Sequence, residues 1–185
     1  MNGLWVVSVV VHAYVALRLL PGVAAASGVV AGAMLAVLLA VSAALVPLAL
    51  RRRRGKRTQE EIRRSDMLAW ASLTLMGLFS SLFVLTVIRD LVELLLLPAV
   101  LLGLTLPAHW RDLSADAVVV LALLVTLIGL YNARKPPRVK VVDIALKDLP
   151  PALQGFKIAQ ISDMHVGPTI KRPAMKYVVA TINRL

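Results

Sequence analysis

Two side chains near the end of the sequence have the types and the spacing of metal ligands. Asp163 and His165 follow a short apolar run, Phe156 to Ile161, and Gly167 comes two residues later. In an extended chain, residues two apart point to the same side, so this carboxylate and imidazole would face a common point where a strand opens into a loop. Oxygen and nitrogen donors of this kind suit a divalent transition metal.

Purely local roles can also account for this pair. Asp163 could cap the turn that follows it, and His165 could be an exposed loop residue. Two protein ligands also do not make a catalytic metal centre. The spacing alone therefore leaves metal ligation and a local role both open.

The elements that must position the pair belong to a chain that is mostly apolar. Hydrophobic residues make up 59% of the 185 residues, and the mean hydropathy is +0.80. Runs of about 18 apolar residues indicate membrane spans. We therefore predict a four-helix transmembrane domain over 1–133, with spans at about 4–20, 23–50, 67–88 and 115–133.

Four residues are expected to shape the ends and bends of these spans. Pro21 and Gly22 separate the first span from the second. Pro47 is expected to kink the second span because proline cannot donate a helical hydrogen bond. Ser114 is expected to be the N-cap of the last span.

Basic residues beside the spans predict their orientation. Residues 51–64 contain eight Lys/Arg and two Glu, and residues 134–185 contain ten Lys/Arg and three Asp. Next to apolar spans, such charge marks cytoplasmic segments and contacts with anionic lipid headgroups rather than with nucleic acid. Four spans place both segments in the cytoplasm. We expect a multi-pass protein of the cell membrane (inner or plasma membrane) whose C-terminal part is cytoplasmic.

A further apolar stretch, 91–106, is too short to be a fifth span. Its longest uncharged run, 94–106, has 13 residues, whereas a hydrocarbon core of roughly 30 Å needs about 20 at 1.5 Å per residue. A fifth crossing would also move the basic residues after 133 to the outside. We expect this stretch to continue the third helix or to form an interfacial segment broken at Pro98.

Several polar residues lie within or beside the predicted spans. Arg89 and Glu93 are four apart and could form an interfacial ion pair. Arg18 is expected to extend its charge to the membrane boundary. His12 is expected to be a packed or hydrogen-bonded imidazole rather than a metal ligand.

Small residues recur every four positions along the second span, at Gly28, Gly32, Ala36, Ala40 and Ala44. Such a stripe lets another helix approach closely in lipid, so we expect close packing and consider helix-mediated self-association. The alternative is chance spacing in an Ala-rich span.

The residues after the last span, 134–185, predict the start of an α/β layered domain. Residues 138–146 alternate and are rich in Val and Ile, which is typical of a strand. Residues 156–161 are typical of a strand buried on both faces. A helix is expected over 171–185, with Pro173 in its first turn and an apolar side formed by Met175, Val178, Val179 and Ile182.

Such a unit is too small to be stable by itself, because two strands and one helix bury little apolar surface. Its apolar faces need further strands and helices. We therefore expect residues 134–185 to be the truncated N-terminal part of a larger domain, with a complete short protein as the alternative.

Residues 149–168 follow a characteristic order. Leu149-Pro150-Pro151 is followed by Leu153-Gln154-Gly155-Phe156-Lys157-Ile158 and then by Ile161-Ser162-Asp163-Met164-His165-Val166-Gly167-Pro168. This order resembles the opening of the calcineurin-like metallophosphoesterases, and most of all their membrane-anchored bacterial branch, whose members carry several N-terminal spans. The resemblance covers about residues 138–185. Met164 departs from it, since such proteins often have Leu there.

The resemblance implies a β-sandwich flanked by helices, with two divalent metal ions (Mn, Fe or Zn) at the strand ends. Asp163 and His165 would ligate the first ion, and the other ligands would lie beyond Leu185. The implied reaction is the hydrolysis of phosphomonoesters, phosphodiesters or pyrophosphates, in which paired cations activate a bridging water and stabilise charge on the phosphoryl oxygens.

The expected function is therefore a membrane-tethered, metal-dependent phosphoesterase that is inactive as these 185 residues alone. Its expected partners are the lipid bilayer and a phosphoester substrate, which the tether suggests to be lipid-linked. The alternative is a non-enzymatic four-helix membrane anchor or interaction module. A transporter is disfavoured because the sequence shows no convincing internal repeat.

Overall fold

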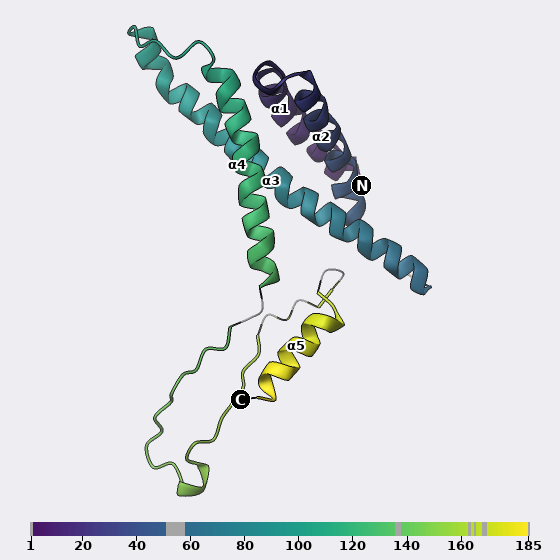
Figure 1. The fold of residues 1–185 in the computed structure, drawn as a ribbon, viewed down its shortest axis with the longest axis vertical. Helices are drawn as coiled ribbons and strands as arrows, with labels where there is room; N and C mark the ends of the chain where they lie inside the picture. Colours follow the sequence, from purple (N-terminus) through teal and green to yellow (C-terminus); the bar gives the residue numbers. More distant parts are fainter. Residues whose placement is uncertain are drawn as a thin grey trace. The chain divides into compact units, whose positions relative to one another are not determined.

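The chain divides into two units, Met1–Ala133 (the membrane unit) and Arg134–Leu185 (the tail unit) (Figure 1). A computed structural model describes residues 2–50, 58–135, 138–162, 164, 166–167 and 170–184.

The membrane unit consists of long helices. Within the described residues these are α1 (Asn2–Ser27), α2 (Val29–Leu50), α3 (Gln59–Leu101) and α4 (Trp110–Arg134). All four are long and apolar enough to cross a bilayer. The prediction of four apolar helices in this part of the chain is confirmed.

The break between the first two helices lies later than expected. Pro21 is inside α1, and the helix continues to Ser27. Gly28 separates α1 from α2, with a φ of +93° that only glycine adopts without strain. The predicted break at Pro21 and Gly22 was therefore wrong. Proline is tolerated within helices that cross membranes, because other groups satisfy the carbonyl it leaves free.

Helix α3 begins eight residues before the predicted span because its start is capped. The Thr58 hydroxyl accepts a hydrogen bond from the backbone N–H of Glu61, and the Glu61 carboxylate accepts one from the Thr58 N–H. This reciprocal pair is a capping box, which satisfies two backbone donors at a helix start.

At its other end, α3 continues through Pro98 to Leu101. The stretch 91–106 therefore mainly continues the third helix, as one of the two alternatives predicted, and the proposed break at Pro98 was wrong. At 43 residues, α3 is about 65 Å long. That is roughly twice the thickness of a hydrocarbon core.

The carbonyl that Pro47 leaves free has a partner in α1. Proline lacks an N–H, so the helical partner of the Ala43 carbonyl is missing. The Ser8 hydroxyl donates to this carbonyl at 3.0 Å. Pro47 and Ser8 are both buried. The proline in α2 therefore creates a polar contact that joins α2 to α1.

The core of the membrane unit takes residues from all four helices. Its buried apolar members are Val15, Leu19, Val23, Leu35, Leu39, Leu78, Leu82, Ala115, Val118 and Ala122. Large apolar side chains elsewhere on the helices remain exposed within the unit, as lipid-facing surfaces do. Figure 1 shows α1 and α2 side by side, with α3 running across them and α4 returning from its end.

Helices α1 and α4 approach each other closely at Gly22. A Cβ atom there would lie 2.7 Å from the Ala115 Cβ and 3.1 Å from the Arg111 carbonyl oxygen. Real Cβ atoms do not come this close to other atoms, so α1 can cross α4 here only because the residue is glycine.

Replacing Gly22 by valine is expected to force α1 and α4 apart and to destabilise the membrane unit by about 1–3 kcal/mol, the usual cost of overpacking. Thermal unfolding in detergent or nanodiscs would measure the change. Gly77→Val is the matched control, since nothing lies within 4 Å of a Cβ added at Gly77. Equal stability of the two variants would contradict the close crossing.

The small-residue stripe of α2 is used only in part. A Cβ at Gly32 would lie 3.0 Å from the Ala24 Cβ, so this position packs closely against α1. Ala40 is exposed, and Gly28 lies in the turn between the helices. The close packing is thus within one chain at Gly32, and self-association through the rest of the stripe stays a prediction.

The tail unit differs from the expected α/β start. No strand occurs among its described residues: 138–146 and 156–161 have irregular backbone. A strand is stable only when a neighbouring strand accepts its hydrogen bonds. The expected strands are therefore not formed in this structure, and a β-sandwich stays a prediction.

The expected helix of the tail unit is present. The unit contains a short 3₁₀ turn, η1 (Pro151–Leu153), and the helix α5 (Arg172–Ile182). Pro173 lies in the first turn of α5, as predicted. Met175, Val178 and Ile182 are half-buried, whereas Val179 is exposed.

Candidate functional site

The two predicted metal ligands, Asp163 and His165, lie outside the described residues. Around them, the Val166 N–H donates to the Met164 carbonyl at 2.8 Å, and the Gly167 N–H donates to the Ile170 carbonyl at 3.1 Å. Helix α5 begins soon afterwards, at Arg172. The position of this helix agrees with the sequence prediction, and ligation by Asp163 and His165 stays a prediction.

The described part of the chain does not hold a metal centre by itself. Within it, no group of three or more His, Cys, Asp or Glu side chains is close enough to bind a metal ion. A catalytic metal usually has three protein ligands. A centre that includes Asp163 and His165 would therefore need donors from outside the described residues.

Ionisable side chains do meet in the membrane unit, where α1 contacts α3. Arg18 donates hydrogen bonds to the Asp90 carboxylate from two nitrogens. Its Nε lies 2.9 Å from both carboxylate oxygens, and its Nη2 lies 2.7 Å from Oδ1. The Tyr14 hydroxyl donates to Asp90 Oδ2 at 2.7 Å. A bidentate contact of this kind is among the strongest hydrogen-bonded pairs in proteins.

A second arginine extends this group toward α4. Arg89 Nη2 lies 3.0 Å from Glu93 Oε1 and 3.0 Å from the Arg111 carbonyl oxygen. Arg89 Nε donates to the Ser114 hydroxyl at 2.8 Å. Glu93 also pairs with Arg18 at 3.1 Å. We call Tyr14, Arg18, Arg89, Asp90, Glu93 and Ser114 the charge cluster.

The side chains of the charge cluster bind one another across three helices, and their charges are largely neutralised. Its two arginines are matched by two carboxylates, so the cluster has no net charge to attract a phosphate. Arg89 is 9% exposed, and its donors contact α1, α3 and α4. The cluster is therefore a connection among α1, α3 and α4 rather than a catalytic site.

Sequence reasoning predicted one pair of this cluster. The pair of Arg89 and Glu93 is confirmed. Arg18 pairs with Asp90 and Glu93, and its extension to the membrane boundary stays a prediction. Ser114, expected to be an N-cap, lies inside α4 and binds Arg89. Spacing reveals partners four residues apart, but not the contact of Arg18 with a residue 72 positions away.

His12 is occupied by structural contacts, as predicted. Its Nδ1 lies 2.7 Å from the Ser8 carbonyl oxygen, and its Nε2 lies 3.0 Å from the Ser42 hydroxyl. A carbonyl only accepts, so Nδ1 donates and Ser42 donates to Nε2. The ring also stacks on Phe79, with centroids 3.5 Å apart. Both nitrogens are engaged, so neither offers a lone pair to a metal.

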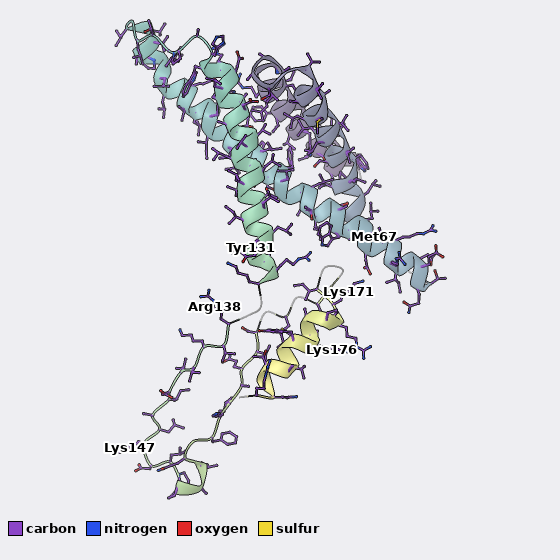
Figure 2. The ribbon with its side chains drawn as sticks, viewed as in Figure 1. Met67, Tyr131, Arg138, Lys147, Lys171 and Lys176 are labelled. Atoms are coloured by element: carbon purple, nitrogen blue, oxygen red, sulfur yellow. The ribbon has the colours of Figure 1, made fainter. Side chains whose placement is uncertain are left out.

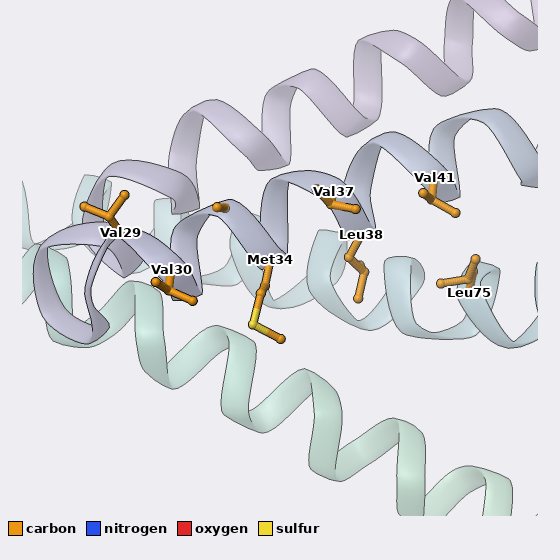
Figure 3. Close-up of a pocket in the computed structure, with 8 residues that line it drawn as sticks. Val29, Val30, Met34, Val37, Leu38, Val41 and Leu75 are labelled. Carbon is orange, nitrogen blue, oxygen red and sulfur yellow. The ribbon is translucent and has the colours of Figure 1, made fainter.

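An open groove of about 630 Å³ runs along α2 and reaches α3 at Leu75 (Figure 3). Its lining residues are all apolar: Val29, Val30, Ala33, Met34, Val37, Leu38, Val41 and Leu75. A phosphoester site needs charged or polar groups for the phosphoryl oxygens. This groove therefore does not serve as the catalytic site.

Comparison with known proteins gives two relatives. A protein of Danio rerio named "Transmembrane protein with metallophosphoesterase domain" is 40% identical over 70 residues, which are 36% of this chain and 16% of the relative. A Bos taurus protein of the same name is 41% identical over 71 residues, which are 38% of this chain and 16% of the relative. No protein-family model matches the chain, and no solved structure matches it significantly.

These matches support a membrane-associated metallophosphoesterase family for the chain. The match spans only 16% of the length of each relative, so it does not extend the relatives' whole architecture to this chain. Both relatives are vertebrate proteins, and the resemblance to the bacterial branch stays a prediction.

Proposed function

We propose that this chain is part of a membrane-tethered, metal-dependent phosphoesterase that hydrolyses phosphomonoester, phosphodiester or pyrophosphate bonds. One observation carries the proposal: two relatives, at 40% and 41% identity, have names that combine a transmembrane protein with a metallophosphoesterase domain. The four long apolar helices agree with the first half of that name. The residue order around Asp163 and His165 agrees with the second.

The metal would be held in part by Asp163 and His165. An anionic carboxylate and a neutral imidazole are a fitting donor set for Mn, Fe or Zn. The remaining ligands of this ion, and those of a second divalent ion, would be supplied by parts of the protein outside residues 1–185. Bound divalent ions would supply an activated water and stabilise negative charge on the phosphoryl group.

The substrate class that best fits a membrane tether is a lipid-linked phosphate or pyrophosphate. A tether confines the enzyme to the bilayer surface and raises its local concentration there. Comparing turnover of a lipid-linked and a water-soluble ester of the same phosphate would test this choice, because the tether should favour only the first. The test of the activity itself is metal-dependent hydrolysis by the complete gene product.

The proposed orientation places the tail unit in the cytoplasm. A reporter fused after Lys140 is expected to be active only if it is a cytoplasmic reporter, because four spans return the chain to the side of the basic 51–64 segment. A reporter fused after Leu106, between α3 and α4, is the matched control and should behave oppositely. Activity of a periplasmic or extracellular reporter after Lys140 would contradict the four-span topology.

A second candidate function is a non-enzymatic anchor or interaction module. The charge cluster favours it, because it links three helices through side chains that have no catalytic use. If the complete gene product binds no metal and hydrolyses no phosphoester, this candidate replaces the enzyme. Cross-linking in membranes would then test self-association.

A further inference from the structure

Helix α5 has a basic side and an apolar side. Arg172 and Lys176 are one turn apart and exposed, and Ala180 follows on the helix at the same interval. Arg184 lies in the turn just after the helix end at Ile182, where it is exposed and its Nε donates to the Ala180 carbonyl at 3.0 Å. Figure 2 shows Lys171 at the start of α5 and Lys176 further along it. We call Arg172, Lys176, Ala180 and Arg184 the basic ridge.

The apolar residues on the other side of α5 are less exposed than the basic ones. Met175, Val178 and Ile182, which are three or four residues apart, are half-buried. Residues with this spacing share one face of a helix. The apolar side is therefore partly covered, whereas the basic ridge is exposed and can meet a partner.

The tail unit has too few acidic residues to neutralise its basic ones. Residues 134–185 contain ten Lys/Arg, three Asp and no Glu. Asp143 and Asp148 are exposed and lie far from α5 in the sequence, Asp148 in a turn and Asp143 in the irregular segment before it. The unit as a whole therefore has a positive excess, and the ridge presents part of it on a regular element.

A membrane surface is the partner closest at hand. The tail unit starts at Arg134, the last residue of a helix able to cross a bilayer. Tethering a basic unit beside a bilayer makes contact with headgroups an intramolecular event at high effective concentration. Each Lys or Arg near the surface raises the binding constant for an anionic membrane by about fivefold.

We propose that the basic ridge of α5 docks the tail unit on anionic lipid headgroups of the leaflet from which α4 emerges. Nucleic acid would also attract positive charge, but the tether brings the ridge to lipid and not to nucleic acid. A consequence that rests on the proposed function is that docking would hold Asp163 and His165 at the lipid surface. The docking itself does not depend on any hydrolysis.

A single labelled cysteine can test the docking, because the chain contains no cysteine. The whole chain carrying Ala180→Cys, which lies on the ridge and is exposed, is labelled with a fluorophore and placed in nanodiscs with a quencher on some headgroups. We expect stronger quenching in discs with about one-third phosphatidylserine than in phosphatidylcholine discs, and loss of the difference in high salt. Equal quenching in both discs would overturn the proposal.

Two charge-reversed variants separate the ridge from the net charge. Arg172→Glu with Lys176→Glu is expected to remove the phosphatidylserine-dependent quenching. Arg138→Glu with Lys140→Glu changes the net charge by the same amount at positions outside α5. This variant should keep at least half of the phosphatidylserine-dependent quenching. Equal losses in the two variants would contradict a role for the ridge. The chain without charge reversals also tests the proposal, through the salt dependence of its quenching. That measurement stands even if a charge-reversed variant misfolds.

The partner is identified by competition in the same assay. Adding inorganic phosphate at the concentration of the lipid phosphate should not release the label, because a lipid surface presents many charges together. Release by duplex DNA at that phosphate concentration, but not by inorganic phosphate, would assign the ridge to nucleic acid and overturn the lipid proposal.

Discussion

Replacing Asp163 by alanine in the complete gene product is expected to lower Mn²⁺-dependent hydrolysis of a chromogenic phosphodiester by at least about 100-fold. Loss of groups that merely orient metal ligands costs 10- to 100-fold in affinity or activity, and loss of a ligand itself costs more. His165→Ala should have a similar effect. The initial rate at saturating Mn²⁺ is the quantity to measure.

Two further variants distinguish ligation from a local role. Asp163→Asn keeps an oxygen that can cap a turn but loses the negative charge that a metal requires. If Asp163 only caps the turn, this variant stays active; if it binds metal, activity falls nearly as far as with alanine. Asp143→Ala is the matched control, because Asp143 is an exposed aspartate of the same unit. Unchanged turnover in Asp163→Ala would remove the site assignment.

Replacing Arg89 by leucine is expected to destabilise the membrane unit by about 3 kcal/mol. This is the lower end of the range for breaking a buried ion pair, chosen because Asp90 and Glu93 keep some exposure. The side chain of Arg89 is 8% exposed, and those of Asp90 and Glu93 are 23% and 18% exposed. Its loss removes the contacts to Ser114 and the Arg111 carbonyl that hold α4 to α3.

Unfolding in mixed detergent, followed by circular dichroism, would measure this loss. Arg89→Lys keeps the positive charge but lacks the planar arrangement of donors of a guanidinium group. Its stability should therefore lie between that of the parent protein and that of Arg89→Leu. Arg64→Leu is the matched control: its partner Glu60 is four residues away and both side chains are largely exposed, so the expected cost is below about 0.5 kcal/mol. An Arg89→Leu protein as stable as the parent would show that the cluster does not hold the helices.

The sequence predicted best what depends on local pattern. Long apolar runs gave the four helices, and the four-residue spacing of Arg89 and Glu93 gave their ion pair. The stretch 91–106 was expected to continue the third helix or to be interfacial, and most of it does continue α3. The role of His12 as a hydrogen-bonded imidazole also followed, because isolated polar side chains within spans need internal partners.

Long-range contacts and exact helix ends were less accessible to sequence reasoning. Pro21 was expected to end α1, but the chain turns at Gly28 instead, where the positive φ favours glycine. The contact of Arg18 with Asp90 joins residues 72 positions apart, which no periodicity reveals. The strands expected at 138–146 and 156–161 have suitable composition, but the described tail residues offer no strand for them to pair with.

The candidate metal site was predicted from chemistry and resemblance alone. The types and spacing of Asp163 and His165 indicate a metal, and the residues around them indicate a family. Neither can supply the other ligands, because these must come from distant parts of a folded domain. The relatives support the family, and the site itself stays a prediction.

The most direct test is metal-dependent turnover by the complete gene product in nanodiscs. The protein is stripped of metal with a chelator, Mn²⁺ is restored in steps, and both bound metal and hydrolysis of a chromogenic phosphodiester are measured. We predict no turnover in the stripped protein and full recovery at about two bound ions per chain. Turnover that persists without metal, or that stays absent at saturating metal, would contradict a membrane-tethered metallophosphoesterase.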